Sequence, residues 1–73
     1  MKVFAERLKE LRLEENLSVL KLSKALGVSD TTVLRWENGS ICPTIEHLYN
    51  MAMFFNVSAD YLLGISSSKI QKE

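Results

Sequence analysis

Residues 30–38, DTTVLRWEN, contain side chains of the types that can recognise the edges of DNA bases. An arginine such as Arg35 can bond bidentately to guanine O6 and N7 or clamp a phosphate, and Thr31 can bond a base or touch a thymine methyl. Leu34 can pack on thymine methyls, and Asp30 can accept a hydrogen bond from cytosine N4. In a second interpretation, Asp30 only stabilises the N-terminus of a helix.

The stretch that would position these side chains runs from residue 17 to residue 39 and reads as two short helices joined by a tight turn. Gly27 can adopt the positive φ of such a turn, which a Cβ would oppose. Ser23 is small where the helices would touch, and Val33 and Trp36 would fill the angle between them. This spacing is that of a helix-turn-helix, whose second helix lies in the major groove of DNA.

Helical periodicity and capping residues predict helices over about residues 3–15, 19–26, 30–38, 45–55 and 59–63. We expect Asn16 to be a left-handed cap after the first helix. The expected N-caps are the hydroxyl residues that precede the other helices, namely Ser18, Ser29, Thr44 and Ser58. We expect one helix-turn-helix DNA-binding domain over residues 1–64 and a flexible C-terminal tail over residues 65–73, which are rich in Ser and Lys.

From Phe4 to Gly64 the chain resembles the lambda repressor-like, or XRE-type, family of DNA-binding domains. The resemblance depends on six short motifs in order, which are RLKELR at 7–12, Leu-Ser at 17–18, LGVS at 26–29, Glu-Asn-Gly at 37–39, Pro-Thr at 43–44 and VSADYLLG at 57–64. It implies an all-α fold, a compact five-helix lambda-repressor-like domain in which helices two and three form the helix-turn-helix.

The resemblance also implies roles for individual residues. Asp30, Thr31, Leu34 and Arg35 match positions that face base edges in the family. Arg12 and Glu37 match an ion pair that links the first helix to the end of the third, and they are therefore expected to be a structural brace. Candidate phosphate contacts are polar side chains near the helix ends, namely Ser18, Lys21, Thr32, Asn38 and Ser40. For Ser18 the capping role is the alternative, and for Lys21 a solvated charge.

The charge balance favours a second interpretation. The chain has 9 basic and 9 acidic residues and a net charge of zero, whereas affinity for DNA depends strongly on Lys and Arg. Val19 stands where much of the family has a Gln that contacts phosphate, and Leu20 stands at a normally polar position. With Leu13 and Leu34 these residues could form an apolar patch for a protein partner, or they could be scattered surface residues without a function.

A candidate dimer surface lies on the last two helices. If Leu48, Met51, Ala52 and Phe55 are core, then several apolar residues have too little interior to fill, and at least two should remain exposed; they are Tyr49, Met53, Phe54, Tyr61 and Leu63. Some family members dimerise through this region, so we expect a weak homodimer there. The alternative is ordinary amphipathic variation around a small core.

Composition excludes several classes of function. A single His and a single Cys supply no metal site, no disulfide within the chain and no nucleophile–base pair, so we expect no enzyme, no metal and no cofactor. No apolar run could span a bilayer, and we expect a cytoplasmic protein. The sequence therefore predicts a DNA-binding transcriptional regulator, a repressor that binds a pseudo-palindromic operator through helix three. The alternative is a helix-turn-helix scaffold that acts mainly through protein contact, such as an antirepressor or the interaction domain of a larger regulator.

Overall fold

The structure is a computed structural model, and it describes residues 1–71. This part of the chain forms α1 (Lys2–Glu14), α2 (Val19–Leu26), α3 (Asp30–Glu37), α4 (Ile45–Phe55) and α5 (Ala59–Leu63), with no strand. The all-α prediction is therefore confirmed, and α2, α4 and α5 have the predicted bounds. Helix α1 begins and ends one residue early, and α3 ends one residue early.

Side-chain caps explain where four helices begin. Ser18 Oγ accepts from the Lys21 N–H at 3.1 Å, and Ser29 Oγ accepts from the Thr32 N–H at 3.1 Å. Thr44 Oγ1 and Ser58 Oγ accept in the same way from the third residue beyond each of them, at 3.1 and 2.9 Å. Each bond satisfies a backbone donor that has no partner inside its helix, so the predicted N-caps are confirmed.

Asparagines and glycines end helices in the left-handed region, and Gly64 after α5 is one of them with φ 82°. Asn16 has φ 55°, Asn56 has φ 54° and Gly27 has φ 71°. The predictions for Asn16 and Gly27 are confirmed, while Asn56 was not predicted. Asn tolerates this region better than other residues with a Cβ, which fits both sites.

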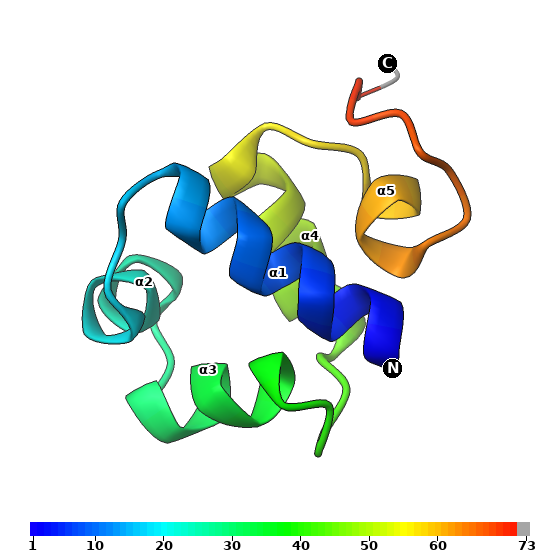
Figure 1. Cartoon of the computed structure of the whole chain (residues 1–73). Coiled ribbons are helices and arrows are strands. Elements are labelled where there is room, and N and C mark those ends of the chain that lie inside the picture. Colours follow the sequence, from blue (N-terminus) through cyan, green and yellow to red (C-terminus); the bar gives the residue numbers. More distant parts are fainter. Residues whose placement is uncertain (72–73) are drawn as a thin grey trace.

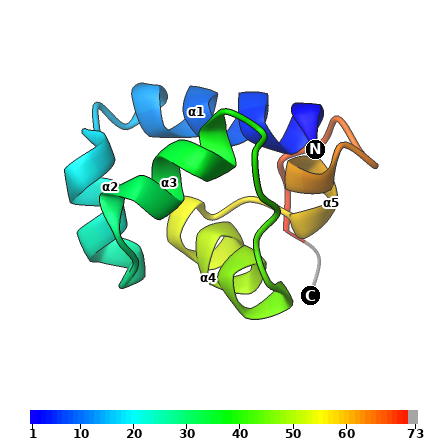
Figure 2. The same ribbon diagram turned by 90° about the horizontal axis from the view of Figure 1, so that it is seen from below.

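Helix α1 lies along one side of the domain and buries Phe4, Ala5, Leu8 and Leu11 in the core. Figure 1 shows α2 beside the C-terminal end of α1 and α5 beside its N-terminal end, and Figure 2 shows α3 and α4 packed below it. The fully buried side chains come from every helix and include Phe4, Leu8, Leu22, Val33, Trp36, Met51 and Leu62. Leu48, which was predicted to be core, is half-buried and packs against this cluster.

Residues 65–71 do not lead away from the domain. They turn back beside α5, and the Ser58 N–H donates to Lys69 O at 3.0 Å. The expectation of a flexible tail over 65–73 includes Lys72 and Glu73, which lie outside the described residues. Mobility of the rest of the tail stays a prediction. Among residues 1–71, no helix is long and apolar enough to cross a membrane, and no cluster of His, Cys, Asp and Glu could hold a metal ion.

Candidate nucleic-acid interface

The turn between α2 and α3 has the geometry that the sequence predicts. The Gly27 N–H donates to Lys24 O at 3.3 Å and the Val28 N–H donates to Ser23 O at 2.9 Å, which closes the end of α2. A Cβ on Gly27 would meet no atom within 4 Å, so its positive φ alone favours glycine there. The turn therefore sets the direction in which α3 begins.

A small residue, Ser23, is fully buried on α2 near the turn that leads to α3. Its hydroxyl donates to Leu20 O at 2.7 Å, so its only polar side-chain atom has a partner. Val33 and Trp36 are buried on the inner side of α3, as predicted. The Trp36 ring lies 5.3 Å from the ring of His47, which is half-buried rather than fully solvated.

An ion pair joins the end of α3 to α1. Arg12 Nε and Nη2 donate to the two carboxylate oxygens of Glu37 at 2.7 and 3.0 Å, and Arg12 Nη1 donates to Leu17 O at 2.9 Å. The two side chains are only 11% and 6% exposed. The hydrogen bond to Glu37 raises the pKa of Arg12, and the negative charge of Glu37 adds to this rise against the opposing effect of burial. The contact between Arg12 and Glu37 implied by the resemblance is therefore present, in a bidentate form that fixes the angle of α3.

The outer face of α3 presents the four residues predicted to read bases. Asp30, Thr31, Leu34 and Arg35 are all exposed. Asp30 is already engaged, because its Oδ1 accepts from the Thr31 N–H at 2.8 Å. This contact supports the interpretation of Asp30 as a residue that stabilises the helix start. Thr31, Leu34 and Arg35 make no side-chain hydrogen bond or ion pair within residues 1–71.

The predicted phosphate contacts lie at helix ends, and several hydroxyls have partners. Ser18 caps α2, and Lys21 is exposed one turn further along it. The Thr32 hydroxyl pairs with the Ser29 hydroxyl at 2.8 Å. Asn38 Oδ1 accepts from the Ser40 N–H at 2.8 Å and from its hydroxyl, which orders the chain just after α3.

The apolar residues of the alternative interpretation divide into two groups. Val19 is half-buried and packs against the core, so it is not part of a surface patch. Leu13, Leu20 and Leu34 are about half exposed, at 54%, 53% and 51%. The structure therefore corrects the expectation for Val19, whose position at the first turn of α2 faces inward.

Only some of the candidate dimer residues are exposed. Tyr49, Met53 and Phe54 are 61%, 53% and 43% exposed on α4, so the expectation of at least two exposed residues is confirmed. Leu63 is half-buried. Tyr61 is only 7% exposed, which corrects its place on the candidate dimer surface. One cause is Arg7, whose guanidinium lies 4.2 Å from the centre of the Tyr61 ring.

Comparison with known proteins agrees with this geometry. The family model described as Helix-turn-helix (HTH_3) matches residues 8–62. The chain belongs to this family. Its resemblance to XRE-type regulators is thereby confirmed, and the relatives of the domain are named as transcriptional regulators rather than enzymes.

Two curated relatives show the range of similarity. The chain is 40% identical to the HTH-type transcriptional activator BcrR of Enterococcus faecalis over 61 residues, which are 84% of this chain and 30% of BcrR. It is 27% identical to the cryptic phage CTXphi transcriptional repressor RstR of Vibrio cholerae over 71 residues, which are 97% of this chain and 64% of RstR. The chain thus spans less than two thirds of the length of either relative.

Two solved structures share the fold. The P22 c2 repressor in complex with a synthetic operator superposes with a TM-score of 0.79 and 27% sequence identity. The match covers 85% of this chain and 94% of the P22 c2 chain. The master regulator for biofilm formation SinR, in complex with DNA, superposes with a TM-score of 0.76 and 26% sequence identity. The match covers 82% of this chain and 97% of the SinR chain.

Proposed function

We propose that this chain is a sequence-specific DNA-binding transcriptional regulator, a repressor that binds a pseudo-palindromic operator through α3. The observation that carries the proposal is the exposed face of α3. Thr31, Leu34 and Arg35 are exposed on a helix whose other face is buried, and the bidentate pair of Arg12 and Glu37 fixes its end. Two solved structures of similar fold contain DNA or an operator.

Each residue has a proposed part in this function. Arg35 is the principal base reader, since it can engage guanine with two hydrogen bonds, and Thr31 and Leu34 contact neighbouring bases. Asp30 acts mainly on the helix start and only secondarily on a base. The positioning contacts to phosphate come from Ser18, Lys21, Thr32, Asn38 and Ser40, together with nearby backbone N–H groups.

A helix-turn-helix monomer reads only a few base pairs, so the proposal includes a weak homodimer through the exposed residues of α4. Two copies related by a two-fold axis would place their α3 helices on half-sites about 34 Å apart. The compartment of action is then the one that contains the DNA, the cytoplasm in a bacterial cell.

The test is selection of bound duplexes from a random pool, followed by affinity measurements across a series of salt concentrations. We expect an enriched pseudo-palindrome and a shallow salt dependence that corresponds to roughly two to five phosphates per monomer, because the domain has few basic residues near α3. A pool without any enriched motif would contradict sequence-specific binding.

A second candidate function is protein contact through α2, and the exposure of Leu13 and Leu20 favours it. Under this alternative Leu20→Glu abolishes association with the partner, whereas Arg35→Ala has no effect on it. Under the DNA proposal Arg35→Ala lowers the affinity for the duplex more than Leu20→Glu does. The same pair of variants therefore separates the two functions.

A further inference from the structure

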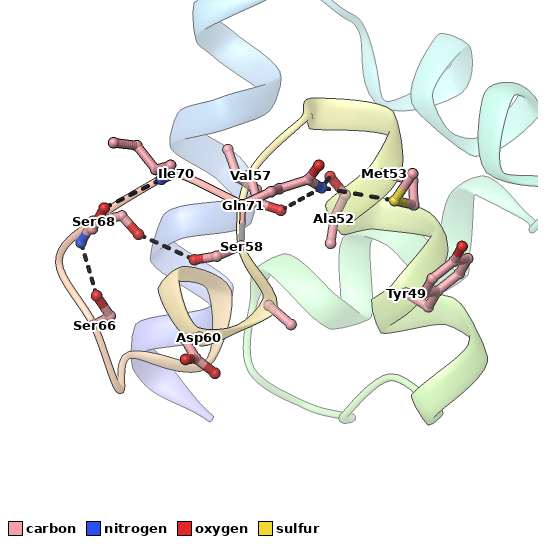
Figure 3. Close-up of a pocket in the computed structure, with 11 residues that line it drawn as sticks. Tyr49, Ala52, Met53, Val57, Ser58, Asp60, Ser66, Ser68, Ile70 and Gln71 are labelled. Atoms are coloured by element: carbon pink, nitrogen blue, oxygen red, sulfur yellow. Dashed lines mark hydrogen bonds between the residues drawn. The ribbon is translucent and has the colours of Figure 1, made fainter. Parts of the chain in front are cut away.

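Residues 66–71, which we call the strap, lie across the end of α4 and the start of α5. The Ser58 N–H donates to Lys69 O at 3.0 Å, and the Ser58 hydroxyl donates to Ser68 O at 3.1 Å. Figure 3 shows the strap passing from Ser66 along α5 to Gln71, whose side chain points toward Ala52 and Met53. Residue 58 is therefore the N-cap of α5 and a docking point for the strap at the same time.

Gln71 attaches the strap to the C-terminal end of α4. Its Nε2 donates to Ala52 O at 3.0 Å and to Val57 O at 2.9 Å. Ala52 O already accepts from the Val57 N–H at 3.0 Å, so Gln71 adds a second donor at the end of α4 and also bonds the Val57 carbonyl just beyond it. Gln71 is half-buried in this position, which indicates an ordered contact rather than a surface side chain near a helix.

The strap also covers Tyr61. Arg7 donates to Ser66 O at 2.8 Å and to Tyr61 O, so it holds the start of the strap. Lys69 Nζ lies 5.5 Å from the centre of the Tyr61 ring and 3.3 Å from Glu14 Oε1. The ring is therefore shielded by Arg7 from α1 and by Lys69 from the strap.

The docked strap borders an apolar face that no other described segment covers. Ile45, Tyr49 and Met53 follow one another at four-residue intervals on α4 and are 88%, 61% and 53% exposed, so they form one stripe. A hollow of about 380 Å³ lies between this stripe, the start of α5 and the strap, with Tyr49, Met53, Asp60, Ile70 and Gln71 among its walls. The strap thus occupies one side of the same surface.

The chemistry of this face fits a second copy of the chain. In a two-fold interface each copy uses the same residues, so a strongly charged face would repel itself. The stripe is uncharged, and Glu46 is the one acidic residue of α4. The contacts that hold the strap are polar, and each is either exposed or only partly buried, which is typical of segments that open at low cost compared with the core.

We propose that the strap is a detachable cover that competes with a second copy of this chain for the α4–α5 face. Release of the strap uncovers one side of Tyr61 and opens the hollow beside Tyr49 and Met53. The inference rests on the homodimer in the proposed function, and it adds that the docked strap weakens this dimer. Only undocked copies associate and both copies must be undocked, so docking lowers the apparent association constant by the square of the undocked fraction.

The test compares the full chain with the double variant Lys69→Ala/Gln71→Ala. Ser67→Ala is the matched control, because this serine lies in the strap and its hydroxyl makes no hydrogen bond within residues 1–71. Amide hydrogen exchange at Ser58 reports docking, since its N–H donates to the strap, and the Leu22 amide in α2 is the internal reference. Sedimentation over a wide concentration range reports association without DNA.

We expect the Ser58 amide to be protected in the full chain and in Ser67→Ala, and to exchange at least about tenfold faster in the double variant with Leu22 unchanged. We expect the dissociation constant of the dimer to fall about a hundredfold in the double variant, because the roughly tenfold larger undocked fraction acts once for each copy.

Each of the following results would overturn the proposal. An unprotected Ser58 amide in the full chain means that the strap does not dock. Faster exchange in the double variant with an equal or weaker dimer means that the strap does not compete. If no form associates at any concentration, both the homodimer and the competition by the strap are wrong. If all three proteins form a dimer of equal strength, only the competition by the strap is wrong.

Discussion

Helices α3 and α5 both lie at the edge of the domain, but different interactions hold them. The inner face of α3 buries Val33 and Trp36, and a bidentate ion pair of 2.7 and 3.0 Å attaches its end to α1. Helix α5 has five residues, and besides its buried Tyr61 and Leu62 it is held by hydrogen bonds from Arg7 and from residues 66–71. The helix that would meet DNA is therefore fixed by buried contacts and a buried ion pair, whereas the region that would meet a second copy depends in addition on exposed and part-buried hydrogen bonds to residues 66–71.

The difference matches what the proposed functions would require of each region. A recognition helix needs one fixed angle, because base edges accept hydrogen bonds only in a narrow geometry. A surface that is sometimes covered and sometimes open needs contacts that exchange easily with water. Paired variants in the two regions can test whether this comparison holds.

The largest effect should come from Arg12→Met. The substitution leaves the buried carboxylate of Glu37 without its partner, and the loss of one side of a buried pair costs about 3–5 kcal/mol. The measurement is the free energy of unfolding in urea. Lys9→Met, on the exposed side of the same helix, is the control and should change it little.

The double variant Arg12→Met/Glu37→Leu sharpens this test. Replacing a whole buried pair by apolar residues is often close to neutral, so we expect it to recover much of the lost stability. If Arg12→Met unfolds at the wild-type urea concentration, the pair is not coupled and the claim that α3 is braced is wrong.

The second comparison uses one substitution at two turns with similar backbones. Gly27 has φ +71° and open space where a Cβ would lie, whereas at Gly64, with φ +82°, a Cβ would lie 2.8 Å from Val3 Cγ1. We expect Gly27→Ala to cost about 1–2 kcal/mol from the backbone alone. Gly64→Ala should cost more, because Val3 must also move.

Thermal unfolding monitored by circular dichroism measures both variants. Val3→Ala in the Gly64→Ala background should recover the excess, and Gly27→Asn should cost less than Gly27→Ala, as Asn16 and Asn56 already adopt the left-handed region. Equal losses at the two glycines would show that α1 and α5 are not in close contact there.

The smallest effect concerns two helix caps. Loss of a Ser cap costs about 1 kcal/mol. Ser18→Ala removes only the bond from the Lys21 N–H, while Ser58→Ala also removes the bond to Ser68 O. We therefore expect Ser58→Ala to destabilise slightly more in calorimetry, and this excess should vanish in the background of Lys69→Ala/Gln71→Ala. An excess that persists there would separate the Ser58 hydroxyl from the strap.

Sequence reasoning succeeded where the signal is local. Ser18, Ser29, Thr44 and Ser58 were recognisable as caps because each bonds an amide three residues later. Gly27 was recognisable because a tight turn between two periodic segments requires a positive φ.

Several contacts between residues that are far apart in the sequence were not predicted. Arg7 and Tyr61 are 54 residues apart, and Gln71 contacts Ala52 and Val57 from a Ser- and Lys-rich segment without periodicity. Nothing local distinguishes such side chains from solvated ones, so Tyr61 was assigned to the candidate dimer surface. Val19 was misplaced because its hydrophobicity was compared with a family pattern rather than with the inner face of α2.

The contacts of α3 with DNA are the central claim, and Arg35 tests them most directly. The measurement is the affinity of the wild-type chain, Arg35→Ala and Lys21→Ala for the selected duplex and for its single-base variants. We expect Arg35→Ala to lose about 1–3 kcal/mol at the selected duplex and to stop discriminating at one base pair of each half-site, whereas Lys21→Ala should weaken all duplexes alike. An Arg35→Ala chain with wild-type affinity and an unchanged preference at every position would contradict the account.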